Sequence, residues 1–84
     1  MIFLVEYDRK EGKILDLKSF RGADRAFAQR ERLSIELENH RSGLSREVVL
    51  LEAADEKILR RTHQRYFKSP GELVESLKHL EAVG

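Results

Sequence analysis

The sequence contains no cysteine, and its net charge is only +1. The absence of cysteine excludes disulfides and thiolate chemistry, and it fits the reducing conditions of the cytoplasm, where we expect the protein to reside. The 16 Lys and Arg residues are nearly balanced by 15 Asp and Glu residues. A strongly basic nucleic-acid binder is therefore excluded, and any basic contact surface must be local.

Long apolar runs are also missing. The opening stretch, residues 1–5, is apolar, but Glu6, Tyr7 and Asp8 follow at once. This run is too short for a signal-peptide core or a membrane span. A chain of 84 residues supports one hydrophobic core, so we expect a single small domain over residues 1–84 with no membrane span.

The densest apolar run lies in residues 46–54, where four branched apolar residues follow one another: Val48, Val49, Leu50 and Leu51. Because successive strand side chains point to opposite faces, both faces of this segment are apolar. The pattern predicts a strand in the middle of a sheet with a cover on each side.

Two earlier segments predict a hairpin. Residues 2–7 and 13–20 have extended patterns, and the turn between them contains Asp8 and Gly12, which suit a tight loop followed by a bulge. The second strand is apolar on one face only, so we expect it at a sheet edge.

Helical periodicity replaces alternation between residue 23 and about residue 40, where apolar residues recur at steps of three and four: Ala23, Ala26, Phe27, Leu33 and Leu37. We expect this stripe to face the core and Gly43 to end the helix. Arg30 projects near the centre of the stripe. Its stem lies across the core edge with the guanidinium in water, or the side chain binds a recessed anion or carboxylate; both interpretations stay open.

Two further helices are predicted after the strand at 46–54. Asp55 can cap a helix over residues 56–67, and the sequence Ser69-Pro70-Gly71-Glu72 is typical of the start of another. The predicted order is β-β-α-β-α-α. The fold class is therefore α+β, with a three-stranded, mainly antiparallel sheet packed with helices.

The helix at 56–67 and the residue after it present a basic face, formed by Lys57, Arg60, Arg61, Arg65 and Lys68. Cations at helical spacing can follow phosphates, so this face is a candidate contact for nucleic acid or another anion. A solvated face neutralised by nearby acids is the structural alternative, and an anionic membrane surface is a third.

A candidate protein interface involves Ile2 and Leu4, which share one face of the first strand. Together with one apolar face of the strand at 46–54, they form a second apolar sheet surface. If the helices leave that surface open, a partner protein or a second copy must bury it. Helices on both faces of the sheet would remove the need for a partner, and the sequence does not separate the two.

Catalytic and metal-binding patterns do not emerge. The three histidines, His40, His63 and His79, come from different predicted elements, and none pairs with another at helical ligand spacing. We find no nucleophile elbow and no glycine-rich phosphate loop. The sequence therefore favours a non-enzymatic protein-interaction module without a cofactor, for which a homodimer is one arrangement; the alternative is a small nucleic-acid-binding protein.

Overall fold

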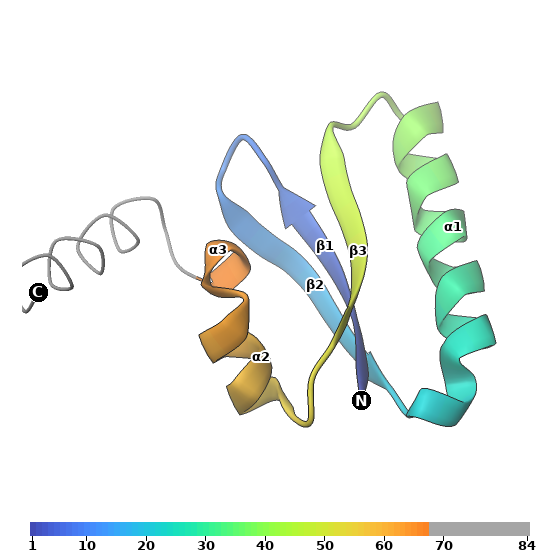
Figure 1. The fold of residues 1–84 in the computed structure, drawn as a ribbon. Helices are drawn as coiled ribbons and strands as arrows, with labels where there is room; N and C mark the ends of the chain where they lie inside the picture. Colours follow the sequence, from blue (N-terminus) through green and yellow to red (C-terminus); the bar gives the residue numbers. More distant parts are fainter. Residues whose placement is uncertain (68–84) are drawn as a thin grey trace, which may run out of the picture.

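The computed structural model describes residues 1–67 of the chain. In order, the elements are β1 (Ile2–Asp8), β2 (Lys13–Phe20), a short 3-10 helix η1 (Gly22–Asp24), α1 (Arg25–Arg41), β3 (Arg46–Glu52), α2 (Glu56–Thr62) and α3 (Gln64–Phe67) (Figure 1). This arrangement confirms the α+β class. The helix predicted from Ser69 onward lies outside the described residues.

The three strands form one antiparallel sheet in the order β2-β1-β3. The prediction that residues 46–54 form the central strand was wrong, because β1 is central and β3 is an edge strand of the sheet described here. The expectation that the second strand lies at an edge is confirmed. Helices cover both faces of the sheet, so even an edge strand such as β3 is apolar on both sides and resembles a central one.

The β1–β2 hairpin forms as the turn residues predict. The Oδ1 atom of Asp8 accepts hydrogen bonds from the backbone N–H groups of Lys10 and Glu11 at 2.9 and 3.0 Å, and Gly12 has a φ of 67°. The Glu11 N–H lowers the pKa of the Asp8 carboxyl below its ordinary value, because it stabilises the charged form. The pairing register shifts after Glu6, as expected for a bulge.

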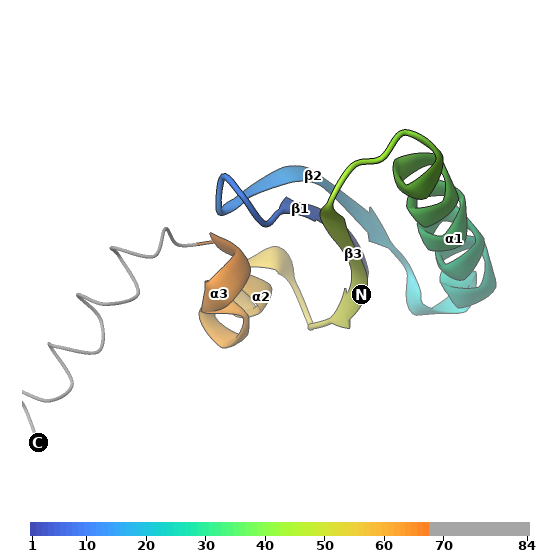
Figure 2. The same cartoon turned by 90° about the horizontal axis from the view of Figure 1, so that it is seen from above.

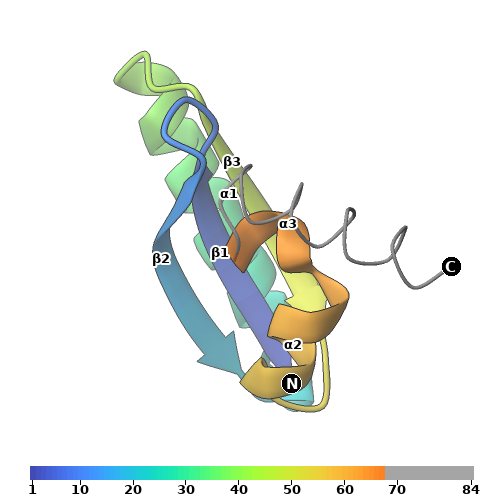
Figure 3. The same ribbon diagram turned by 90° about the vertical axis from the view of Figure 1, so that its left-hand side faces the viewer.

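Helices lie on opposite faces of the sheet, as Figures 2 and 3 show from two directions. On one face, α2 and α3 bring Tyr66 against Val5 and Tyr7, with the two tyrosine rings edge to face at a centroid distance of 5.2 Å. On the other face, α1 lies over the side of β1 that carries Leu4 and Glu6. A single layer of sheet therefore supports two small cores.

The C-terminal end of α1 is closed by Gly43, as predicted, with a φ of 68°. The backbone N–H of Gly43 donates to the carbonyl of His40 at 3.2 Å, and that of Leu44 donates to the carbonyl of Asn39 at 2.8 Å. This pair of bonds is a Schellman motif, which satisfies carbonyls that the helix leaves open. The chain then turns directly into β3.

The helix predicted over residues 56–67 is interrupted. Asp55 caps α2 as expected, since its side chain accepts from the N–H of Ile58 at 2.8 Å, but α2 stops at Thr62. His63 leaves the helical conformation, with φ of −123° and ψ of 50°, before α3 begins.

The described part of the chain contains no helix long and apolar enough to cross a membrane.

Candidate interaction surface

The long helix α1 turns its predicted apolar stripe away from the sheet. Ala28 and Asn39 are its buried residues, and Ile35 between them is half-buried. By contrast, Phe27, Leu33 and Leu37 are 50%, 50% and 61% exposed. The prediction that this stripe faces the core was therefore wrong.

We call the exposed set the outward stripe, and it consists of Ala26, Phe27, Arg30, Leu33 and Leu37. At 100° per residue, these side chains project within about 120° of one another around the helix axis. Phe27 marks the border of the stripe, since its ring lies 5.9 Å from that of Phe20 on β2. Nothing in the described residues covers the other large apolar side chains of the stripe.

Polar contacts explain the rotation of α1. The carboxylate of Glu6 on β1 accepts a hydrogen bond from the Asn39 side chain at 3.2 Å and from the Arg46 guanidinium at 3.1 Å. Glu6 has a side chain only 14% exposed, so this carboxylate needs both donors. At the other end of the helix, Arg25 forms an ion pair with Glu52 of β3. The polar side of α1 therefore faces the sheet.

The signal for this orientation combines a helix spacing that the sequence shows with a strand register that the structure gives. Strand carboxylates at Glu6 and Glu52 lie on the same face of the sheet, according to the pairing register. Asn39 and Arg25 lie fourteen residues apart on α1, which is four turns of helix, so that one helix face can meet both carboxylates. An apolar stripe alone does not reveal such a match, and it predicted the opposite face.

Arg30 lies on the outward stripe and is exposed. Its stem does not lie across the core edge, because the core is on the other side of the helix. No acidic side chain of residues 1–67 forms an ion pair with it. Arg30 is therefore a cation set among exposed apolar residues.

Ile2 and Leu4, the predicted interface residues, are 1% and 2% exposed. They lie on the face of β1 that α1 covers, so the open sheet surface on which that prediction depended is buried within the chain. The apolar surface available to a partner is the outward stripe of α1. The homodimer itself stays a prediction, and the surface that could form it is the outward stripe instead of the face of β1 that carries Ile2 and Leu4.

The basic residues do not form one continuous face. Arg60 forms an ion pair with Glu56 at 2.9 Å and lies over the Phe67 ring at 4.7 Å. Arg65 forms an ion pair with Glu47 at 2.7 Å. The interruption at His63 also separates the cations of α2 from Arg65. These contacts leave fewer of the cations available to an anion than the sequence predicted.

Two other members of the predicted basic set, Lys57 and Arg61, form no ion pair with another described residue, and Lys68 lies outside the described residues. These two cations lie one turn apart on a short helix, which is a smaller positive surface than the predicted five residues. Nucleic-acid binding stays a prediction on this reduced set.

A polar cluster that the sequence did not predict fastens α3 to the sheet. The Tyr66 hydroxyl donates to Oε1 of Glu47 at 2.9 Å, and the Arg65 guanidinium lies over the Tyr66 ring at 4.9 Å. The pKa of Tyr66 is raised above its ordinary value. Burial of the phenol is the larger cause, and its hydrogen bond to Glu47 is the second. The cluster satisfies its own polar groups and has a structural role.

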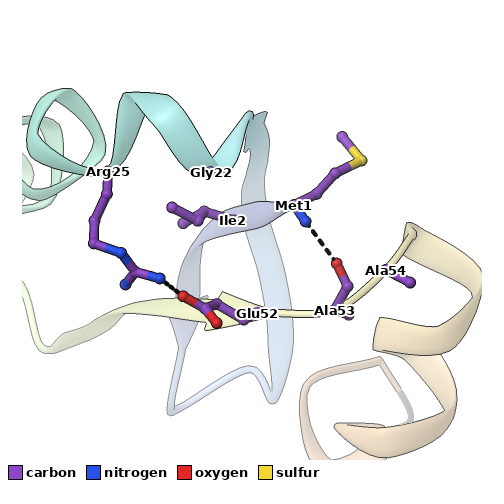
Figure 4. Close-up of a pocket in the computed structure, with 7 residues that line it drawn as sticks. All are labelled: Met1, Ile2, Gly22, Arg25, Glu52, Ala53 and Ala54. Atoms are coloured by element: carbon purple, nitrogen blue, oxygen red, sulfur yellow. Dashed lines mark hydrogen bonds and ion pairs between the residues drawn. The ribbon is translucent and has the colours of Figure 1, made fainter.

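A pocket of about 370 Å³ opens where β1 begins (Figure 4). The N-terminal ammonium of Met1 donates to the carbonyl of Ala53 at 2.9 Å, and Arg25 pairs with Glu52 across the pocket. Its charged groups therefore bind one another. Within residues 1–67, no group of three His, Cys, Asp or Glu side chains could hold a metal ion.

Comparison with protein-family models, with curated proteins and with solved structures found no match to this chain.

Proposed function

We propose that the protein is a small, non-enzymatic protein-interaction module that binds its partner through the outward stripe of α1. The observation that carries this proposal is the exposure of Phe27, Leu33 and Leu37, which are at least half exposed on one side of one helix. Single exposed leucines are normal on protein surfaces. An aligned set at helical spacing is typical of a helix that packs against another element.

Burial of the stripe contributes a favourable term to binding, against which the lost freedom of the two partners must be set. Complete burial of a Leu or Phe side chain contributes about 1.5 to 3 kcal/mol, so that burial of a half-exposed one contributes on the order of 1 kcal/mol. Three such side chains lie on this stripe, 50%, 50% and 61% exposed. A partner gains this energy without rearranging the domain, because the stripe contributes little to the core.

The alternative function, nucleic-acid binding, has less support. Arg60 and Arg65 are engaged by Glu56 and Glu47, and the whole chain has a net charge of only +1. Phosphate binding requires cations that are not already neutralised. The interaction surface on α1 does not depend on these residues.

Site-specific photocrosslinking in cells tests the proposal. A photoreactive amino acid in place of Leu37 should yield a discrete protein adduct, and the additional change Leu33→Lys should abolish it. The matched control places the same amino acid at Leu15, a leucine 38% exposed on β2. Equal adduct formation at both positions, or none at position 37, would contradict the assignment of the outward stripe as the binding surface.

A further inference from the structure

The occupant of the outward stripe can be specified, on the basis of the proposed function. We infer that the partner is a second copy of this chain, and that the two α1 helices pack antiparallel along their outward stripes. The resulting dimer is isologous: the same surface is used by both copies, related by a twofold axis. Spacing, charge and shape along α1 support this arrangement.

The spacing of the exposed residues matches a helix–helix seam. Ala26, Arg30, Leu33, Leu37 and His40 alternate steps of four and three, and all five are exposed. Alternating steps of three and four are those of the a and d positions that meet across two packed helices. Figures 1 and 2 show no described element on the outer side of α1, so a second helix can approach.

Charge decides the direction of the two helices. In a parallel pair, each seam residue faces its own copy, so that Arg30 would face Arg30 of the second copy in a partly dehydrated layer, where like charges repel. An antiparallel pair places a positions against d positions. Arg30 then faces Leu33, and the two guanidinium groups are separated.

The same register matches large side chains with small ones. In an antiparallel pair, each step forward along one helix is a step backward along the other, so the residue numbers of facing residues have a constant sum. If Arg30 faces Leu33 of the second copy, this sum is 63, and Leu37 faces Ala26. A half-exposed leucine therefore packs over a methyl side chain, and the pairing occurs twice by symmetry. Alternation of large and small residues lets the layers interdigitate.

An ion pair across the seam completes the complementarity. Arg30 and Glu38 project on the same side of the seam, and helix side chains lean toward their own N-terminus. In an antiparallel pair these leanings bring Arg30 of one copy toward Glu38 of the other. Glu38 is exposed, with Oε2 3.7 Å from the Arg41 guanidinium and Oε1 accepting from the Ser42 hydroxyl at 3.4 Å. A carboxylate has further acceptor sites, to which the Arg30 guanidinium can donate.

The area available predicts a weak dimer. The helix has 17 residues and is therefore about 25 Å long. A seam of this length falls short of the roughly 800 Å² per partner that a standard stable interface buries. We therefore expect reversible association at micromolar to high micromolar concentration.

Disulfide trapping tests the geometry. Because the sequence contains no cysteine, only the introduced thiols can form a cross-link. We expect the double variant Ala26→Cys/Leu37→Cys to form a covalent dimer under mild oxidation. Each single variant should form far less, because in the antiparallel pair residue 26 lies about 16 Å along the axis from its own copy, beyond disulfide reach. Single variants that cross-link as fast as the double variant would overturn the antiparallel arrangement.

Charge reversal provides an independent measurement on the reduced, cysteine-free protein. Arg30→Glu and Glu38→Arg should each raise the dissociation constant of the dimer about two- to fivefold in sedimentation experiments, and the double reversal should restore it. Circular dichroism checks that each variant is folded. Additive weakening in the double reversal would contradict the Arg30–Glu38 contact.

The failure of this inference can be distinguished from failure of the proposed function. A strict monomer at high micromolar concentration, combined with a Leu33-dependent adduct of another protein at position 37, overturns the homodimer alone. A strict monomer with no adduct at position 37 overturns both. A position-37 adduct with the mass of two chains, together with cross-linking of the cysteine double variant, supports both.

Discussion

Two leucine-to-alanine changes test which face of α1 packs against the core: one at Leu4, on β1 beneath the helix, and one at Leu37, on the outward stripe. Leu4 is 2% exposed beneath α1, whereas Leu37 is 61% exposed on the outward stripe. A buried Leu→Ala change loses about 2 to 5 kcal/mol, since the transfer energy and the cavity both contribute. A substitution at an exposed position away from special features stays within about 0.5 kcal/mol.

Leu4→Ala should therefore lower the free energy of unfolding by about 2 to 5 kcal/mol, a large fraction of the total for a domain of this size. The melting temperature should fall by roughly 4 to 8 °C for each kcal/mol. Leu37→Ala should leave the free energy of unfolding nearly unchanged. Urea denaturation of both variants at protein concentrations well below the expected dissociation constant of the dimer measures these differences on the monomer. The slope of the free energy with denaturant checks two-state behaviour.

The reasoning is refuted if Leu37→Ala is not clearly less destabilising than Leu4→Ala on the monomer. If Leu37→Ala costs as much as Leu4→Ala at low protein concentration, α1 packs through the stripe that the sequence periodicity indicated. If the cost of Leu37→Ala appears only at high concentration, it belongs to association. The concentration dependence thus separates folding from dimer formation.

Further predictions concern the Tyr66 hydrogen bond, the pKa of Tyr66, the Asp55 cap and the basic residues of α2. Tyr66→Phe should lower stability by about 0.5 to 1.5 kcal/mol at pH 7, because the hydrogen bond to Glu47 is lost; unchanged urea midpoints would contradict that contact. Because the pKa of Tyr66 is raised in the folded state, the unfolded state loses the phenol proton at lower pH, which favours unfolding. The wild type should therefore lose more stability than Tyr66→Phe as the pH rises above the ordinary tyrosine value of 10.0. Asp55→Ala should lower the melting temperature through loss of about 0.5 to 2 kcal/mol of capping energy, and an unaffected temperature would place the start of α2 elsewhere. Binding of random-sequence nucleic acid should be undetectable at low salt with micromolar protein; measurable binding that weakens in Arg61→Ala, but not in the control Lys13→Ala, would revive the nucleic-acid function.

Local features of this fold were predictable from the sequence because their causes lie within a few residues of one another. Asp8 and Gly12 form the hairpin turn, Gly43 ends α1, and Asp55 caps α2, all as expected. Each depends on a side chain that bonds its neighbouring backbone or on a backbone angle that favours glycine. The order of strands and helices follows from the same short-range patterns.

The strand order needed the tertiary structure. Apolar residues on both faces of a strand show that both faces are covered, but not whether another strand lies on each side. β1 and β3 share this property. The hairpin pairs β1 with β2, and the tertiary structure decides that β3 joins β1 and not β2, which makes β1 central.

The candidate surface was also decided by contacts between residues far apart in the chain. Periodicity located a stripe on α1, and the sequence alone predicted that it would be buried. The carboxylate of Glu6 reverses this outcome, since it is nearly enclosed and must be satisfied by Asn39 and Arg46, which lie 33 and 40 residues away. Likewise, Tyr66 contacts Glu47 and Tyr7 from α3, beyond the point where α2 stops at Thr62. The sequence by itself determined the hairpin turn, the end of α1 at Gly43 and the start of α2 after Asp55. The need to satisfy buried polar groups, visible only in three dimensions, decided which face of α1 is left for a partner.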